Sequence, residues 1–357
     1  MEDLTIIIPT LNRPQFARRI LQYWSGMSPH IICVDGSLTK LDQNFVDSLE
    51  KNILYFHKPN ASLTDRFQFI VDKISTKYSM LHADDEFHLP HALSQCVKEI
   101  EKCDLACCLG RCLEFIIENN SIIARPWKTF HTSFEDYSIM DESAIVRVLN
   151  HLNPYVCATT YAVTKSDIFK NNLSAFKNIQ KDDVFFELLY AICTVFQGKI
   201  KVINVLSWLR SNENQPHRMT AKKADSGKEN LIETILNDSF RTNPAIKNLS
   251  NHLCSLNAQY NQKDLNDVLY SAFRAYAKQA SLSFKVANLY NNNDIPLSAE
   301  KRILQETIGT WRDRDFWPPN VLDLIGAASL WQKKGIDSGV SEIQEIQDLI
   351  LRGYSKF

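Results

Sequence analysis

The sequence predicts an α/β fold with a mainly parallel sheet flanked by helices, followed by an all-helical C-terminal domain. Through the first half of the chain, short apolar segments alternate with amphipathic helical patterns. That alternation is typical of βαβ units and of a parallel sheet. Beyond residue 228 the recognisable segments all have helical periodicity.

The α/β part is predicted element by element from these patterns. The expected strands are residues 4–9, 31–35, 53–57, 78–83, 104–115, 157–164 and 199–206. The expected helices are residues 15–24, 45–51, 63–74, 90–102 and 182–196. Between residues 118 and 141 the pattern loosens, and we expect a hairpin and a loop there.

A polar stretch at residues 212–228 contains Pro and Gly and has no periodicity, so we interpret it as a loop or linker, with a lid as an alternative. Pro244 suits a first helical turn, and Ser341 with Gln344 has the spacing of a capping box. The expected C-terminal helices are residues 231–236, 244–256, 265–289, 298–308, 320–331 and 341–351. We therefore predict two domains, residues 1–218 and 219–357.

Composition excludes several classes of protein. The 357 residues are 45% hydrophobic and 23% charged, which is ordinary for a soluble chain with a real core. The formal net charge of −1 argues neither for nucleic acid nor for an anionic membrane as a partner. Apolar runs stay well short of the ~20 residues of a membrane span, and the N-terminus lacks a signal-peptide core. We expect a cytoplasmic protein, at most peripheral at the inner face of the membrane.

Nine cysteines are present, and five of them fall between residues 96 and 112. Such a cluster invites a zinc hypothesis, but the C-x-x-C spacing of structural zinc sites does not occur in it. Residues 104–115 instead have the pattern of a buried strand in which cysteine serves as a small apolar residue. This interpretation predicts a reducing compartment and no disulfide framework.

Polar residues follow three of the expected strands. The turn Pro9-Thr10-Leu11-Asn12 comes after the first strand, Asp35-Gly36-Ser37 closes the second, and Asp84-Asp85-Glu86 follows the strand at residues 78–83. Ligands of open α/β sheets bind beyond the carboxyl ends of such strands. Asp35 is suited to bind a base or ribose, with a simple Asp-Gly turn as the alternative.

Three consecutive carboxylates repel one another, and a site usually offsets that repulsion with a divalent cation or a basic side chain. Oxygen ligands suit Mg²⁺ or Mn²⁺, which also neutralise phosphates. The alternative is an exposed acidic turn before a helix, since acids favour helix N-termini. Because Asp84-Asp85-Glu86 follows an apolar strand, we favour a metal site over an exposed acidic turn.

Taken in order, TIIIPTLNRP, VDGS and HADDEF resemble the GT-A-type glycosyltransferases, especially family 2, over about residues 4–210. The resemblance implies a GT-A-like (Rossmann-like) fold and sugar transfer from a nucleotide-diphosphate donor to a hydroxyl of a glycan or lipid-linked acceptor. It also implies assistance by Mn²⁺ or Mg²⁺ and inversion at the anomeric carbon.

Site residues follow from the same resemblance. It implies that the nucleotide sugar is bound by nine residues: Pro9, Thr10, Asn12, Arg13, Asp35, Arg66, His82, Asp84 and Arg210. It assigns the metal to Asp84, Asp85 and His217. A surface position on a helix is the alternative for Arg66, and a solvated loop residue is the alternative for His217. His82 stands where the family's usual Asp-Ala-Asp-Asp pattern has its first Asp, which implies a different donor preference or weaker metal dependence.

Asp182-Asp183 opens an expected helix and resembles the family's Glu-Asp pair, whose second acid is the catalytic base. This implies that Asp183, beside Asp182, takes the proton of the acceptor hydroxyl. A helix N-cap pair is the alternative interpretation.

Two other functions are alternatives to a transferase. A nucleotidyltransferase usually carries a Gly-rich loop after the first strand, and PTLNRP has no glycine. The other rival is a non-catalytic GT-A-like binding or scaffold protein that acts through its helical domain, where residues 311–317 are rich in aromatic side chains. The helical domain is otherwise suited to acceptor binding, partner docking or homo-oligomer formation.

Overall fold

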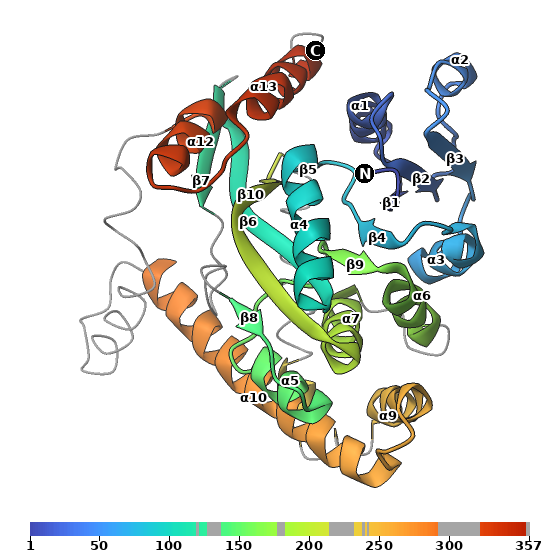
Figure 1. Ribbon diagram of the computed structural model, residues 1–357, viewed down its shortest axis with the longest axis vertical. Helices are drawn as coiled ribbons and strands as arrows, with labels where there is room; N and C mark the ends of the chain where they lie inside the picture. The colour runs from blue at the N-terminus through green and yellow to red at the C-terminus, as the bar shows by residue number, and fades with distance from the viewer. Residues whose placement is uncertain are drawn as a thin grey trace.

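The computed structural model describes residues 1–118, 121–126, 137–176, 183–213, 232–237, 240, 243–291 and 322–354. Within these ranges ten strands form one sheet with helices packed on both faces (Figure 1). The strands are β1 (Leu4–Thr10), β2 (His30–Asp35), β3 (Ile53–His57), β4 (Tyr78–Leu81), β5 (Phe87–His88), β6 (Leu105–Glu118), β7 (Ser121–Pro126), β8 (Ser138–Ile139), β9 (Val163–Lys165) and β10 (Lys199–Ser211). The α-helices are α1 (Pro14–Trp24), α2 (Gln43–Asp47), α3 (Leu63–Ile70), α4 (Pro90–Cys103), α5 (Ala144–His151), α6 (Ser166–Ala175), α7 (Asp183–Gln197), α9 (Pro244–Leu256), α10 (Gln262–Asn291), α12 (Leu324–Lys333) and α13 (Val340–Tyr354). The predicted α/β class with a helical C-terminal region is confirmed.

The sheet has the strand order β3-β2-β1-β4-β9-β6-β10-β5. In addition, β7 pairs with β6, and β8 pairs with β10. β1 to β4 run parallel, as the βαβ pattern predicts. β9 lies antiparallel between β4 and β6, so β6 and its parallel partner β10 run in the same direction as β1. The carboxyl ends of β1, β2, β4, β6 and β10 therefore lie at one edge of the sheet.

Two hydrophobic cores cover the two faces of this sheet. Side chains alternate along β1, so that Ile7 enters one core while Ile6 and Ile8 enter the other. The core on the Ile7 side, here the α7-side core, also receives apolar residues of α3, α5, α6, α9 and α10. The opposite, α1-side core is filled by α1, α4, α12 and α13. All these helices are thus anchored to the sheet that carries the strand ends.

The helices beyond residue 218 divide between the two faces. α9 and α10 contribute Leu249 and Phe273 to the α7-side core, whereas α12 and α13 contribute Trp331 and Ile346 to the α1-side core. The C-terminal segment also joins the sheet at β7, where Ala124 N donates to Leu322 O over 2.8 Å. α12 lies next to β7 (Figure 1). The division of the chain at residue 218 stays a prediction, and these helices pack into the same two cores as the strands.

Local differences from the sequence prediction have physical causes. α2 begins before residue 45 because the side chain of Asp42 caps it, accepting from Phe45 N over 3.1 Å. The strand expected near residues 157–164 is reduced to β9, because the chain before it is irregular. α5 and α6 were not expected. The helix predicted at residues 298–308 lies outside the described residues.

The cysteine-rich strand is β6. Cys107, Cys108 and Cys112 are buried in it, in keeping with their interpretation as small apolar residues. Cys96 on α4 lies in the same core as Cys108, whereas Cys107 and Cys112 enter the core on the opposite face of the sheet. These thiols fill core space.

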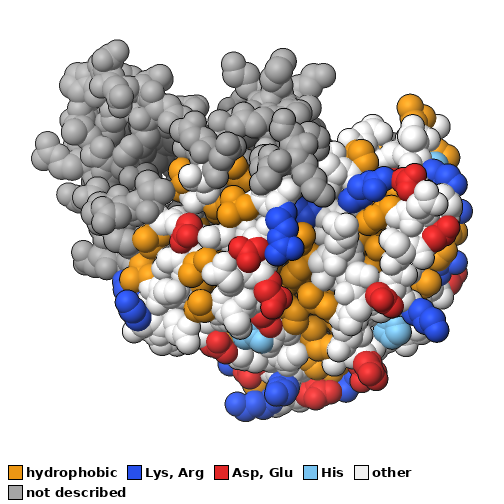
Figure 2. Space-filling view, turned by 90° about the horizontal axis from the view of Figure 1, so that it is seen from above, with side chains coloured by type: hydrophobic (Ala, Val, Ile, Leu, Met, Phe, Trp, Pro, Cys, Tyr) orange, Lys and Arg blue, Asp and Glu red, His pale blue; other side chains and the backbone are white. Residues whose placement is uncertain are grey.

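Charged side chains of both signs are interspersed on the face shown in Figure 2, with hydrophobic side chains between them. This mixture matches the formal net charge of −1. Among the helices that the structure describes, none combines the length and the apolar character that crossing a membrane requires.

One buried histidine makes the α7-side core sensitive to acid. His151 is fully buried, with Nδ1 2.5 Å from the Tyr137 hydroxyl, and burial lowers its pKa to about 3. The unfolded chain, with an ordinary histidine pKa of about 6.5, takes up a proton that the folded chain refuses. The stability present above that pKa is therefore lost as the pH falls toward the folded value.

We expect the His151→Gln variant to lose about 2 kcal/mol less free energy of unfolding than the wild type between pH 7.5 and pH 5. Urea unfolding at both pH values measures this difference, and groups common to both proteins cancel. The exposed His30 offers a matched control, His30→Gln, which should keep the acid sensitivity of the wild type. Full acid sensitivity in His151→Gln would contradict the prediction.

Candidate functional site

The first strand ends bring three polar positions to the same edge of the sheet. In the parallel register, Thr10 at the end of β1 lies beside Asp35 at the end of β2. On the other side of β1, the chain leaves β4 with His82 N donating to Ile7 O over 2.9 Å. The acidic segment that follows, Asp84 and Asp85, thus begins next to Thr10.

The turn after β1 presents Arg13 to this edge. Asn12 adopts the left-handed conformation, with φ of 56°, which asparagine tolerates better than most residues. Its backbone N–H donates to Ser37 Oγ over 2.7 Å, tying the turn to the end of β2. Pro14 then begins α1, so Arg13 is the residue at the N-cap position.

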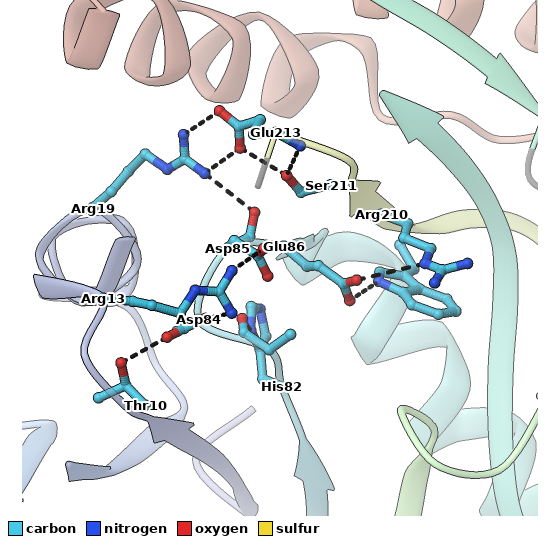
Figure 3. A network of polar contacts seen from close by, with 12 residues as sticks. Thr10, Arg13, Arg19, His82, Asp84, Asp85, Glu86, Arg210, Ser211 and Glu213 are labelled. Atoms are coloured by element: carbon cyan, nitrogen blue, oxygen red, sulfur yellow. Dashed lines mark hydrogen bonds and ion pairs between the residues drawn. The ribbon is translucent and has the colours of Figure 1, made fainter. Parts of the chain in front are cut away.

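The centre of the site is an ion pair between Arg13 and two carboxylates (Figure 3). Arg13 Nη1 lies 2.8 Å from Asp84 Oδ1, and Nη2 contacts Asp85 Oδ2. The Thr10 hydroxyl donates to the second oxygen of Asp84 over 2.6 Å. Burial raises the pKa of Asp84 to about 6, although the Arg13 charge opposes the shift. The Arg13 guanidinium therefore offsets part of the negative charge of Asp84 and Asp85.

Glu86 extends the acidic cluster toward β10. Its Oε2 accepts from Trp208 Nε1 over 2.7 Å, and Arg210 Nε lies 3.9 Å from Oε1. Burial and the nearby Asp85 charge raise the pKa of Glu86, whereas Arg210 and the Trp208 bond lower it. Arg210, which we predicted to bind the nucleotide sugar, thus lies at the same edge of the sheet, at the end of β10.

A second arginine supports the acidic segment from behind. Arg19 on α1 donates to both carboxylate oxygens of Glu213, over 2.7 and 2.5 Å, and to Asp85 O over 3.2 Å. Ser211 adds a bond to Glu213 over 2.8 Å. All of these polar groups are buried. Sequence reasoning missed the pair, because 194 positions separate its partners and neither residue lies in a motif.

Asp35 and Arg66 order the ends of β1 and β2. The Asp35 carboxylate accepts from Ser37 N over 2.8 Å and from the Tyr55 hydroxyl over 2.6 Å. Arg66 is buried at 4% exposure and donates Nη1 to Thr10 O over 2.7 Å. Its predicted role in binding the nucleotide sugar stays a prediction, beside this structural role at the strand ends.

His82 lies beneath the acidic segment, fully buried between Trp24 and His88. Its Nδ1 is 2.6 Å from Ala83 O; since a carbonyl only accepts, Nδ1 carries the proton. Nε2 is then an acceptor, and it has no hydrogen-bond partner among the described residues. Burial lowers the pKa of His82 to about 4. The residue that replaces the family's first Asp is thus a neutral imidazole near neutral pH.

The predicted base is located only by its backbone. Asp183 is the first residue of α7, and its side chain lies outside the described part of the structure, as do Asp182 and His217. One turn further along α7, Glu187 accepts from the Tyr155 hydroxyl over 2.7 Å. Burial raises the pKa of Tyr161, and the carboxylates of Glu86 and Glu187 raise it further. Tyr161, whose ring centroid lies 4.9 Å from that of Trp208, is therefore within the electrostatic influence of both carboxylates.

A divalent cation fits the chemistry of this edge. Asp84 and Asp85 offer hard oxygen donors, and a guanidinium already bridges them. Among the described residues, no group of three or more His, Cys, Asp or Glu side chains could hold a metal. The protein would then supply two carboxylates, and phosphates and water the other ligands, as is usual for Mg²⁺.

A cavity of about 400 Å³ lies away from this edge, between α5, α6, α7 and the end of α9. Arg147, which lines it, donates to the main-chain oxygens of Val195, Phe196, Asp141 and Glu142. Lys165 is likewise paired, with Asp104 at 2.5 Å. The positively charged groups that line the cavity are thus paired within the protein. The strand ends are therefore the better candidate for a functional site.

Comparison with protein families supports the resemblance seen in the motifs. Residues 5–171 match the family described as Glycosyl transferase family 2. The GT-A-type, family 2-like character expected from the sequence is thereby confirmed for this part of the chain. The matched segment holds Thr10, Arg13, Asp35, Asp84 and Asp85, and it ends before α7 and β10. A comparison with curated proteins finds no match.

Similar solved structures include those of TarS from S. aureus. TarS 1–349 is 10% identical with a TM-score of 0.42, over 83% of this chain and 94% of that one. The structure titled as TarS 1–349 in complex with UDP-GlcNAc is 10% identical with a TM-score of 0.46, over the same shares. A longer TarS chain is 11% identical with a TM-score of 0.42, over 78% of this chain and 55% of that one.

The buried Arg19–Glu213 pair yields a stability prediction. Glu213→Ala leaves the Arg19 charge buried without its carboxylate, and we expect the free energy of unfolding to fall by about 3–5 kcal/mol. The double variant Arg19→Met with Glu213→Leu should recover most of that loss, because it removes both charges. Denaturant unfolding measures all three proteins.

The exposed pair Lys199–Glu142 provides the control. Glu142→Ala should leave the free energy of unfolding nearly unchanged, since solvent screens exposed ion pairs. A Glu213→Ala protein as stable as Glu142→Ala would show that the Arg19–Glu213 pair does not stabilise the fold.

Proposed function

We propose that the chain is a glycosyltransferase that moves a sugar from a nucleotide-diphosphate donor to a hydroxyl of a glycan or lipid-linked acceptor. The observation that carries the proposal is the convergence of Thr10, Arg13, Asp35 and the Asp84–Asp85 pair at one sheet edge. The family match over residues 5–171 supports this transferase class. A cytoplasmic location, peripheral membrane contact and a homo-oligomer through the helical segments are further proposals.

The donor nucleoside would lie against the ends of β1 and β2. Asp35 is 2% exposed, and its acceptor oxygens suit a base edge or ribose hydroxyls. The turn from Pro9 to Asn12 would hold the other side of the nucleoside. The diphosphate would then reach Arg13 and the N-terminus of α1, where the helix dipole favours anions.

Asp84 and Asp85 would hold Mn²⁺ or Mg²⁺, which when bound supplies Lewis-acid stabilisation of the charge on the leaving diphosphate. The protein's own cations act on the same charge. Arg13 lies at the acidic pair, and Arg210 on β10 lies 3.9 Å from the neighbouring Glu86. Positive charges at this edge stabilise the negative charge that develops on the leaving diphosphate in the transition state.

Asp183 would be the base that takes the acceptor proton as the hydroxyl oxygen attacks the anomeric carbon. The proton moves to the carboxylate, and the sugar–phosphate bond breaks on the opposite face, which inverts the configuration. Its position as the first residue of α7, where the resemblance to the family's Glu-Asp pair implies the second acid, supports this assignment. Asp182 would lie beside the base.

Donor binding is the first prediction of this proposal. A thermal-shift screen of nucleotides and nucleotide sugars, UDP and UDP-GlcNAc among them, should show a metal-dependent rise in melting temperature for one nucleotide family. Ligand at 100 times its Kd adds about 2.7 kcal/mol of stability. Asp84→Asn should abolish the metal-dependent part, whereas the exposed Asp104→Asn should retain it. A flat response across the panel would favour the scaffold alternative.

The base assignment predicts a separation of binding from turnover. Asp183→Asn should lower the transfer rate by about 10²–10⁴-fold, because a positioned general base contributes that much. Donor binding should stay within experimental error of the wild type. Asp167→Asn, also in the first turn of a helix, is the matched control and should transfer at the normal rate. Loss of donor binding and turnover together in Asp183→Asn would identify a structural acid instead.

A further inference from the structure

The strongest unassigned feature of the site is the position of the Arg13 guanidinium. Its two terminal nitrogens contact one oxygen of Asp84 and one of Asp85, while Thr10 takes the other Asp84 oxygen (Figure 3). Three of the four carboxylate oxygens therefore contact a protein donor. Arg13 stands where a cation bridging the two acids would bind, so a guanidinium and a metal ion compete for the same oxygens.

The two acids alone make a weak metal site. No third candidate ligand joins them among the residues that the structure describes. Mg²⁺-type sites with one or two carboxylates depend on substrate phosphates and water for their remaining ligands. Arg13 weakens the site further, because its positive charge repels a cation and offsets one of the two negative charges.

Arg13 is less enclosed than Arg19, and its guanidinium also lies 5.0 Å from the centroid of the Phe16 ring. It lies in the turn between β1 and α1, and its side chain is 22% exposed, unlike the buried Arg19. The backbone is held independently by the Asn12–Ser37 bond and by Pro14. A diphosphate at the N-terminus of α1 offers the guanidinium charge-assisted bonds of the kind that it makes to the carboxylates.

We propose that the Arg13 guanidinium occupies the place of the metal ion between Asp84 and Asp85 until the donor diphosphate draws the guanidinium away. Divalent metal and donor therefore bind cooperatively. This inference rests on the proposed function. Withdrawal of Arg13 leaves two carboxylates to bind the metal and places the guanidinium on a phosphate. Each ligand therefore raises the affinity for the other by the same factor. Arg13 acts as a positioning residue in this scheme.

Mn²⁺ binding, measured by the paramagnetic resonance of free Mn²⁺, tests the proposal without relying on turnover. For the wild type without nucleotide we expect weak binding, and with saturating UDP a rise in affinity within the 5–150-fold range of typical coupling. Arg13→Gln should bind Mn²⁺ about tenfold more tightly than the wild type in the absence of UDP, and UDP should add little further.

Two variants serve as controls. Arg18→Gln removes the same charge from α1, the helix that follows Arg13, but Arg18 lies over the Phe45 ring, so this variant should behave as the wild type. Arg13→Lys keeps a cation at the acids and should restore weak Mn²⁺ binding. Melting temperatures near the wild-type value will show that the variants are folded.

The outcomes separate this inference from the proposed function. If UDP binds but Arg13→Gln has the Mn²⁺ affinity of the wild type and of Arg18→Gln, Arg13 does not occupy the metal position and the inference is wrong. An unchanged coupling factor in Arg13→Gln overturns it equally. If neither UDP nor other nucleoside diphosphates bind to any of the proteins, the proposed function fails and the coupling fails with it.

Discussion

The parallel pairing of β1 with both β2 and β4 is the constraint on which the site depends. Because the three strands run in one direction, their carboxyl ends deliver Thr10, Asp35 and the segment after Leu81 to a single edge. β9 preserves this arrangement. Its antiparallel pairing with β4 and β6 returns β6 and β10 to the common direction, so that Arg210 and Glu213 reach the same edge. Loops alone would not fix these side chains, since their backbones lack the sheet's hydrogen-bond ladder.

Clustered buried acids at this edge are stabilised by arginines that differ in burial. Arg19 is enclosed, and its bidentate pair with Glu213 fixes both the end of β10 and the main chain at Asp85. Arg13 is half-buried and pairs with the acids themselves. An enclosed charge that loses its partner is costly, whereas a charge on a partly exposed side chain loses less because water can reach it. The first arginine therefore maintains the fold, and the second is available for exchange with ligands.

Features that depend on neighbouring residues in the chain could be predicted from the sequence. Apolar segments of four to six residues located β1 to β4, and the polar residues directly after them identified Thr10, Asp35, Asp84 and Asp85. Long-range partners were beyond it, because the Arg19–Glu213 pair and the Trp208–Glu86 bond join positions more than a hundred residues apart. α5 and α6, of eight and ten residues, were missed because each is shorter than the window of about 11 to 18 residues over which helical periodicity is read. The strand that contains β9 was predicted too long because the chain before β9 is irregular. The pairing of Arg13 with the acids required the geometry of the turn at Asn12.

The return of α12 and α13 to the α1-side core has a consequence for synthesis. Ile343, Ile346 and Ile350 are fully buried there against a face that β1 and α1 begin. A ribosome adding 5–20 residues per second needs roughly 15–60 s between completing α1 and delivering α13. During that interval α1 and α4 cover only part of this apolar face, and the part that α12 and α13 later cover is exposed to chaperones. A nascent chain released before α12 keeps that face exposed and is prone to aggregate.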